Sequence, residues 1–362
     1  MKTILFALFV LLASLSFAQE SVPEISFDSV PDFLKLPPGM NFGEVAGVAV
    51  NSKGHVFVFE RSNVSGPAFA PAAAQLLEFD ADGKYLREIG HNLYAWSFAH
   101  TVRIDKDDNI WVTDKGSDMV VKFNPAGRVI MVFGRRQEPN DAGVKPWDRN
   151  LDPPLPAVDG LFRQPTDVAW DSEGNIYISD GYVNSRIAKY DKNGDWVKSW
   201  GEKGSGPGQF RLPHSIAVDA QGNVYVADRG NRRIQVFDDD GKFLRQITID
   251  VPTNPNARPA IGNKPDLTQT RAAKTQWPGS PWTICITPPP NQVLYTSDAF
   301  PGRIYKLSLD GKVLGMFGKS GKHLGEFGWV HEMDCSQGNQ NVLYVGELLN
   351  WRVQKLILHP AP

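Results

Sequence analysis

The chain repeats one pattern of short apolar runs and turns, and this repetition constrains its fold more than any other feature. In the clearest copy, residues 212–245, an apolar run is followed by the turn sequence Asp219-Ala-Gln-Gly-Asn223 and then by β-branched and aromatic residues that end at Asp228. A third run begins at Arg233, and a fourth follows Gly241. Runs of this composition separated by turn residues predict four antiparallel strands.

The same unit recurs along the whole chain. Two further copies are clear, in residues 164–201 and 99–134, and three looser copies begin near Val45, Trp282 and Val330. Six four-stranded sheets can bury their faces only against one another, and a radial arrangement leaves only short exposed edges. The sequence therefore predicts an all-β fold, with residues 19–362 forming one six-bladed β-propeller.

The last copy shows only three strands and ends at Leu358. Its outer strand is expected from residues 22–27, which would close the ring. Two connections are long and rich in proline and asparagine, residues 138–160 and 251–279. Loops of this length are usually functional rims or lids, or else disordered.

The first residues have the character of an export signal. Met1 and Lys2 precede an apolar stretch, and small residues lead to Ala18. This pattern predicts a signal peptide over residues 1–18 with cleavage after Ala18. We expect a secreted or periplasmic protein that has no membrane segment after cleavage.

Charge and cysteine content exclude several classes of partner and fold. The formal net charge is −2, and acidic and basic residues are interspersed, so nucleic acid is not an expected partner. The two cysteines, Cys285 and Cys335, are too few for a disulfide framework. One bridge could form in an oxidising compartment, and the sequence leaves their pairing open.

Aligning the copies on the carboxylate that ends the second strand reveals a column of histidines. Blades two, four and six carry histidine at one matched position, and the column in chain order is Ala46, His100, Thr166, His214, Trp282 and His331. The innermost strand of each blade lines the channel of a propeller, so residues from alternate blades point at one spot on the axis. Three histidines with an open fourth position are the usual ligands of a catalytic zinc. The alternative is three separately hydrogen-bonded histidines, but the chain holds only seven in all, which favours the metal site.

Three polar residues are expected beside this column. Arg61 and Arg229 each follow a second-strand carboxylate directly, and Tyr182 follows Asp180 by two residues. Arginine suits a planar carboxylate, and a tyrosine near positive charge can act as a general base. Each alone would more often be structural or solvated, but together with the histidines they indicate a site for a small anionic substrate. The carboxylates that recur in nearly every blade are expected to be structural.

These residues resemble the peptidyl-α-hydroxyglycine α-amidating lyases, which are six-bladed propellers of the NHL-repeat group. The resemblance runs from about Phe33 to Leu356 and is strongest over residues 164–169, 179–187, 208–216 and 226–229. It implies zinc bound by His100, His214 and His331, the column already found from the repeats. It further implies catalysis by Tyr182, with Arg61 and Arg229 contacting the substrate.

The resemblance also implies a calcium ion. Its ligands would be the backbone carbonyls of Val48 and Val102 and the side chain of Glu332, which replaces the aspartate of the family. Oxygen ligands of this kind suit calcium, whose coordination is flexible. Two further differences from the family are Trp329 in place of a methionine and Val183 in place of a cysteine.

We therefore expect a zinc-dependent lyase that cleaves an N-acyl-α-hydroxyglycine into an amide and glyoxylate. Its partner would be a small carboxylate-bearing substrate or the C-terminus of a peptide. The alternative is a non-catalytic NHL-repeat propeller that binds a peptide or polymer partner on one face. A third option is a hydrolase like the propeller lactonases, but those bind calcium through oxygen ligands, whereas three histidines favour a nitrogen-preferring metal.

Overall fold

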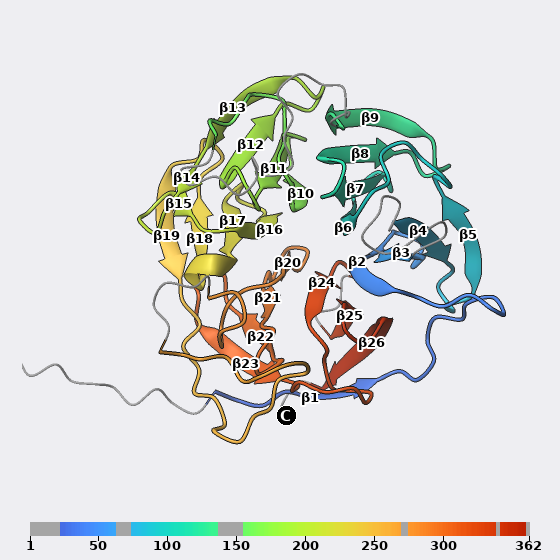
Figure 1. The fold of residues 1–362 in the computed structure, drawn as a ribbon, viewed down its shortest axis with the longest axis vertical. Helices are drawn as coiled ribbons and strands as arrows, with labels where there is room; N and C mark the ends of the chain where they lie inside the picture. Colours follow the sequence, from blue (N-terminus) through green and yellow to red (C-terminus); the bar gives the residue numbers. More distant parts are fainter. Residues whose placement is uncertain (1–21, 63–73, 137–154, 269–273, 338–340, 360–362) are drawn as a thin grey trace, which may run out of the picture.

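The computed structural model describes residues 22–62, 74–136, 155–268, 274–337 and 341–359. The predicted signal peptide and most of the connection 138–160 lie outside these residues. The described strands form six four-stranded antiparallel sheets arranged around a central axis (Figure 1). The predicted fold, a six-bladed propeller, is confirmed.

Each blade runs from an innermost strand at the axis to an outer strand at the rim. Blade 1 contains β2 (Glu44–Val50), β3 (Val56–Arg61), β4 (Gln75–Phe79) and β5 (Tyr85–Ile89). Blade 2 contains β6 (Ala99–Ile104), β7 (Ile110–Asp114), β8 (Met119–Phe123) and β9 (Val129–Gly134). Blade 3 contains β10 (Asp167–Trp170), β11 (Ile176–Asp180), β12 (Arg186–Tyr190) and β13 (Trp196–Trp200).

The second half of the ring follows the same order. Blade 4 contains β16 (Pro213–Val218), β17 (Val224–Asp228), β18 (Arg233–Phe237) and β19 (Phe243–Ile247). Blade 5 contains β20 (Ile284–Ile286), β21 (Leu294–Ser297), β22 (Ile304–Leu307) and β23 (Val313–Phe317). Blade 6 contains β24 (Val330–Asp334), β25 (Val342–Glu347), β26 (Arg352–His359) and, at its rim, β1 (Ser26–Ser29). A short parallel pair, β14 (Glu202–Lys203) and β15 (Gln209–Phe210), connects blades 3 and 4.

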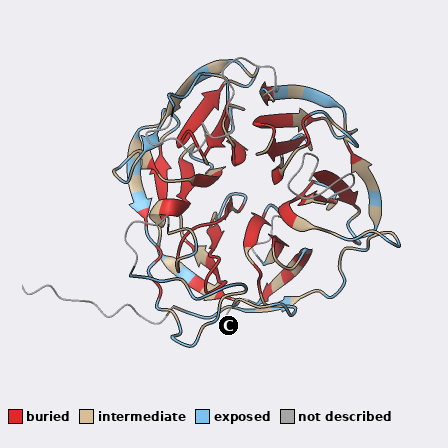
Figure 2. Cartoon of the chain, in the orientation of Figure 1, coloured by how far each residue is buried: buried red, intermediate tan, exposed pale blue. Residues whose placement is uncertain are grey.

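The burial of the strands explains why the sequence favours this arrangement. The second and third strands of the blades are mostly buried, whereas the outer strands consist mainly of partly buried and exposed residues (Figure 2). Aromatic side chains fill the space between blades; Phe133 of blade 2 packs on Tyr190 of blade 3 with ring centroids 4.8 Å apart. Neighbouring blades thus pack through shared hydrophobic clusters, as expected of a propeller.

The chain closes the ring with its N-terminal strand. β1 pairs antiparallel with β26, with Ser26 opposite His359, so the outer strand of blade 6 comes from the N-terminal segment as predicted. The strand begins later than expected, because Ile25 instead donates its backbone N–H to the carbonyl of Met316 in blade 5. The N-terminal segment therefore ties blade 5 to blade 6.

The recurring carboxylates have the structural task expected of them. Asp228 accepts a hydrogen bond from the backbone N–H of Arg211 at 2.7 Å, just before the innermost strand of its own blade. Matching bonds of 2.8–3.0 Å are made by Asp114 to Ser97, Asp180 to Arg163 and Asp298 to Gly279. Each carboxylate fixes the point at which the chain enters the innermost strand, and thus the place of the residues that follow.

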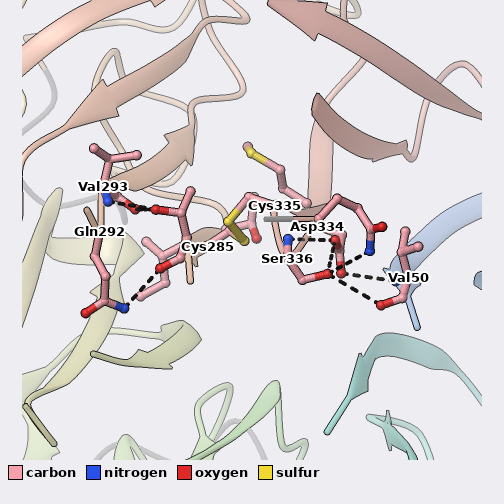
Figure 3. Close-up of a disulfide and its surroundings, with 12 residues drawn as sticks. Val50, Cys285, Gln292, Val293, Asp334, Cys335 and Ser336 are labelled. Carbon is pink, nitrogen blue, oxygen red and sulfur yellow. Dashed lines mark hydrogen bonds between the residues drawn. A yellow bond between two sulfur atoms is a disulfide. The ribbon is translucent and has the colours of Figure 1, made fainter. Parts of the chain in front are cut away.

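Cys285 and Cys335 form a disulfide, which resolves the pairing that the sequence left open (Figure 3). Cys285 lies on β20 and Cys335 directly follows β24, so the bond joins the innermost strands of blades 5 and 6. Next to it, Asp334 accepts the backbone N–H of Val50 from blade 1 at 3.1 Å. No helix among the described residues is long and apolar enough to cross a membrane.

Candidate functional site

The three histidines of the predicted column converge at one end of the channel. His100, His214 and His331 lie on β6, β16 and β24 and are buried. One ring nitrogen from each lies within 4.8 Å of the others, and the ring centroids are 4.6–4.8 Å apart. In the described part of the chain this is the one cluster of histidine, cysteine and carboxylate side chains that could hold a metal.

The intervening blades orient the three imidazoles. The Nδ1 atoms of His100, His214 and His331 bond to the backbone carbonyls of Thr166, Trp282 and Ala46 at 2.5, 2.5 and 2.7 Å. A carbonyl can only accept, so each Nδ1 must carry the proton and each Nε2 is left with a lone pair. Such bonds to the second nitrogen typically fix metal-binding histidines. The odd-numbered blades, which lack histidine in this column, thus supply the matching acceptors.

The surroundings keep the imidazoles neutral. Burial lowers the pKa of all three histidines well below its ordinary value, and neighbouring positive charges lower it further. For His214 the largest such charge is Arg229, and for His331 it is Arg61. Neutral imidazole is the form that binds metal, so protons do not compete for these nitrogens at neutral pH.

This donor set fits a zinc ion. Three neutral imidazoles with fixed tautomers face one another, and the Nε2 lone pair of each is available as a metal ligand. Zinc sites with three protein ligands keep a fourth position open for water or substrate. His100, His214 and His331 would hold the ion, as the repeat alignment predicted.

Tyr182 lies directly beside this cluster. Its hydroxyl is 3.4 Å from Nε2 of both His100 and His214. Burial by itself raises the pKa of Tyr182, but the nearby Arg229, Lys115 and Arg61 outweigh it and lower the pKa from its ordinary value. The structure thus brings the predicted tyrosine to the histidines and favours its phenolate form.

Arg229 is a buried cation that points into the same site. Its guanidinium carbon lies 5.9 Å from the centroid of the Tyr182 ring and 4.3 Å from that of the Trp282 ring. Its Nε has no hydrogen-bond partner, and no carboxylate of the described residues lies within ion-pair distance. A buried guanidinium without an anionic partner is well suited to bind a substrate carboxylate.

Arg61 is placed near the site but is already engaged. Its Nη1 donates to Glu44 at 2.7 Å, its Nε donates to the carbonyl of Ala99 at 2.9 Å, and it stacks on Phe98. Ala99 directly precedes His100. Arg61 therefore helps to place a histidine ligand and adds positive charge, whereas Arg229 is the arginine better placed to receive an anion.

Lys115 is a site residue that the sequence analysis missed. Its Nζ lies 4.1 Å from the centroid of the Tyr182 ring, and its charge lowers the pKa of that tyrosine. The signal was present, because Lys115 directly follows Asp114 just as Arg61 and Arg229 follow their own carboxylates. The same alignment column would have found it.

Two tryptophans form a wall next to the histidines. Trp282 lies 5.9 Å from His214 and 6.2 Å from His331 between ring centroids, and Trp329 packs against Trp282 at 5.2 Å. Trp329, which stands where the family has methionine, is half-buried. The substitution thus enlarges an aromatic surface beside the ring nitrogens.

One of the predicted calcium ligands already has a cationic partner in the structure. Val48, Val102 and Glu332 all lie on innermost strands, β2, β6 and β24. However, Oε1 of Glu332 lies 2.9 Å from Nη2 of Arg103, a contact that the sequence analysis did not foresee. The only charged ligand of the predicted set therefore already faces a cation of the chain itself.

Comparisons with known proteins agree with this geometry. The NHL repeat model matches residues 162–190 and 210–237. The peptidylglycine alpha-amidating monooxygenase of Rattus norvegicus is 35% identical over 229 residues, which are 57% of this chain and 22% of the relative. A probable peptidyl-alpha-hydroxyglycine alpha-amidating lyase of Caenorhabditis elegans is 29% identical over 172 residues, 44% of each chain. The NHL repeat-containing protein 3 of Mus musculus is 32% identical over 214 residues, 54% of this chain and 53% of the relative.

These matches span about half or less of each relative's length. Among solved structures, a streptogramin B lyase superposes with a TM-score of 0.55 at 13% identity, covering 92% of this chain and 98% of that chain, which is a likeness of fold. The resemblance stated from the sequence motifs is confirmed. The chain is a six-bladed β-propeller that contains NHL repeats at residues 162–190 and 210–237 and is similar in sequence to proteins named as peptidyl-α-hydroxyglycine α-amidating lyases.

Proposed function

We propose that the protein is a zinc-dependent lyase that cleaves an N-acyl-α-hydroxyglycine into an amide and glyoxylate. The observation that carries this proposal is the convergence of His100, His214 and His331 at one end of the channel, with the Tyr182 hydroxyl 3.4 Å from Nε2 of the first two. The sequence similarity to a protein named as an amidating lyase supports the same reaction.

Each residue of the site has a separate role in the proposed reaction. Zinc bound by His100, His214 and His331 would polarise an oxygen of the substrate and lower the pKa of its hydroxyl. Tyr182, with its own lowered pKa, accepts the proton of that hydroxyl. The carbon–oxygen double bond of glyoxylate then forms as the carbon–nitrogen bond breaks, and Tyr182 returns the proton it accepted to the departing amide nitrogen.

The charged and aromatic neighbours hold the substrate for this step. Arg229 binds the carboxylate that becomes part of glyoxylate, since its guanidinium has no acidic partner among the described residues. Trp282 and Trp329 shield the site from water. The cleavage consumes no water, so a shielded pocket suits it better than it suits a hydrolase.

Glyoxylate release from synthetic α-hydroxyhippurate tests the proposal. Protein loaded with zinc should release glyoxylate and benzamide in equal amounts, and metal-free protein should not. Hippurate, which lacks the hydroxyl, is the control substrate and should be inert. Absence of product from protein with one zinc per chain would reject the lyase assignment.

We also propose that the protein is exported and acts outside the cytoplasm. The signal sequence of residues 1–18 and the disulfide between Cys285 and Cys335 support this location. N-terminal sequencing of the protein recovered from the producing cells should begin at Gln19. An unprocessed N-terminus would contradict the proposal.

A second candidate function is a non-catalytic propeller that binds a peptide or polymer. The similarity to an NHL repeat-containing protein favours it, since repeats of this kind also occur outside the lyases. In that case His214→Ala would lower thermal stability without removing any activity on α-hydroxyhippurate. Loss of glyoxylate release from a folded His214→Ala protein would show that the protein is an enzyme and would rule out the non-catalytic propeller.

A further inference from the structure

A single arginine occupies the channel below the three histidines. Arg103 lies on β6, three residues beyond His100, and its side chain is 15% exposed. It binds Asp167 of β10 through two bonds, from Nε to Oδ1 at 3.0 Å and from Nη2 to Oδ2 at 2.6 Å. This paired geometry is the strongest that arginine forms with a carboxylate.

The carboxylate of Asp167 is fully satisfied in this position. Besides Arg103, its Oδ1 accepts the backbone N–H of Val168 at 2.8 Å. Its Oδ2 accepts the hydroxyl of Ser215 at 2.7 Å and the backbone N–H of Ile216 at 3.1 Å. Asp167 thus joins blade 3 to blade 4 and needs no further cation.

The guanidinium also reaches the remaining blades on the far side of the channel. Its Nη2 lies 2.9 Å from Oε1 of Glu332 on β24 and donates to the carbonyl of Ile284 on β20 at 3.4 Å. From blade 2, one side chain therefore contacts the innermost strands of blades 3, 5 and 6, and Ser215 of blade 4 at 3.3 Å. In blade 1, Gly47 stands at the position that matches Asp167, Ser215 and Glu332 of the other blades. A Cβ there would lie 2.6 Å from the backbone nitrogen of Val102.

The residues held by Arg103 are the direct neighbours of the site described above. Glu332 follows His331, Ser215 follows His214, and Asp167 follows Thr166, whose carbonyl binds His100. Because neighbours along a strand move together, fixing these three residues fixes the backbone that carries the imidazoles.

We propose that Arg103 is a built-in cation that replaces a bound calcium ion in this channel and positions the three histidines. The protein then needs no calcium for folding or for binding metal at the histidines. This inference does not depend on the reaction that the site performs, because calcium binding and stability are measured without a substrate.

Two features make calcium binding the measurement that tests this proposal. Oε2 of Glu332 is buried and has no hydrogen-bond partner among the described residues. A pocket of about 170 Å³ is lined by Arg103, Cys285 and Asp334 among others.

The first experiment is calcium titration of the zinc-loaded wild-type protein in calcium-depleted buffer, by calorimetry and by thermal unfolding. We expect no saturable binding at millimolar calcium and no change in Tm. Binding of one calcium per chain with a rise in Tm would overturn the proposal, whatever the result of any activity assay.

The second experiment replaces the cation. Arg103→Ser leaves two buried carboxylates without it, so Tm should fall and zinc affinity should drop by about tenfold or more. Added calcium should bind at one site per chain and restore both. Arg103→Lys keeps the charge and should remain indifferent to calcium, and Arg103→Ser combined with Glu332→Gln should lose the calcium response.

The variants keep the proposal falsifiable even if one of them folds poorly. An Arg103→Ser protein that refolds only when calcium is present supports the replacement. An Arg103→Ser protein that is as stable and binds zinc as tightly as the wild type without calcium would show that Arg103 positions nothing. If Arg103→Ser does not refold with or without calcium, the wild-type and Arg103→Lys titrations decide.

Discussion

The two ends of the channel are built from the same innermost strands but carry opposite chemistry. At one end, His100, His214 and His331 are neutral, and their Nε2 atoms are not used for the carbonyl bonds that hold Nδ1; the Tyr182 hydroxyl lies 3.4 Å from two of them. Three residues further along β6, Arg103 is charged and bound to Asp167 and Glu332. The difference shows that one end presents ligand atoms for a metal, whereas at the other end a cation of the chain itself contacts the carboxylates.

The physical cause lies in what each layer leaves unsatisfied. The histidines use Nδ1 for carbonyls of the neighbouring blades, so Nε2 remains an acceptor that a metal can bind. Asp167 instead has partners for both oxygens within the protein. We expect changes at the histidine end of the channel to affect metal binding and catalysis. Changes near the Arg103 end are expected to affect the stability of the fold.

The largest effect is expected from removing one of the three histidines. His214→Ala should abolish zinc binding and lower glyoxylate release by at least about 10⁴-fold, because a catalytic metal supplies several kcal/mol of transition-state stabilisation. Metal analysis and the glyoxylate assay measure both changes. His323→Ala, which removes an exposed histidine, is the matched control and should behave as the wild type. Retention of zinc by the His214 variant would refute the three-histidine site.

Removing the proposed base should separate chemistry from metal binding. Tyr182→Phe should lower kcat by about 10²–10⁴-fold, the range expected for a general base, while zinc content stays at one per chain. Single-turnover kinetics on α-hydroxyhippurate, together with metal analysis, test this. A variant with wild-type kcat would mean that Tyr182 is only a neighbour of the site.

The disulfide at the Arg103 end of the channel should matter for stability rather than for catalysis. Replacing Cys285 and Cys335 by serine opens a loop with a sequence separation of 50 residues and should lower the free energy of unfolding by about 2–4 kcal/mol. Denaturant unfolding measures the loss. Zinc content and kcat of the folded variant should stay unchanged, and loss of either would show that the two ends are coupled.

The smallest effect is a shift in pH dependence. Arg229→Gln removes the main positive charge that lowers the pKa of Tyr182, so that pKa rises and a higher pH is needed to form the phenolate. The acid limb of the kcat–pH profile should therefore move to higher pH. Loss of the carboxylate contact should also lower kcat/KM by about 10–100-fold.

The control for this prediction is Arg232→Gln. Arg232 binds Asp250 and the carbonyl of Pro278, so its loss should leave the pH profile unchanged. An unshifted profile in the Arg229 variant would show that Arg229 does not set the pKa of the reacting group.

Much of the candidate site could be predicted from the sequence because a propeller repeats. Each copy occupies an equivalent place around the axis. Residues at the same position of the repeat therefore lie at the same distance from the axis and at the same level along it. This is why the histidines and Tyr182 were found without coordinates, and why Lys115, at the same place in its copy as Arg61, could have been found as well. The origin of the outer strand of blade 6 was predicted in the same way, because the last copy of the repeat has only three strands.

Contacts across the axis could not be predicted in this way. The bonds from Arg103 to Asp167 and Glu332 join different blades and different heights of the channel. These contacts depend on side-chain rotamers and on the width of the channel, and an alignment of the repeats contains neither. The engagement of Arg61 by Glu44, which separates its role from that of Arg229, is of the same kind.

The sequence by itself determined the number of blades, the order of their strands and the three imidazoles directed at the axis, because these features follow from local periodicity and turn residues. Only the tertiary structure decided which nitrogen of each histidine bonds to a carbonyl, which arginine has no carboxylate partner among the described residues, how the two cysteines pair, and that a guanidinium contacts the glutamate predicted to bind calcium. Hydrogen bonds and charges act over a few ångströms in space, and closing the ring brings together residues that are far apart along the chain.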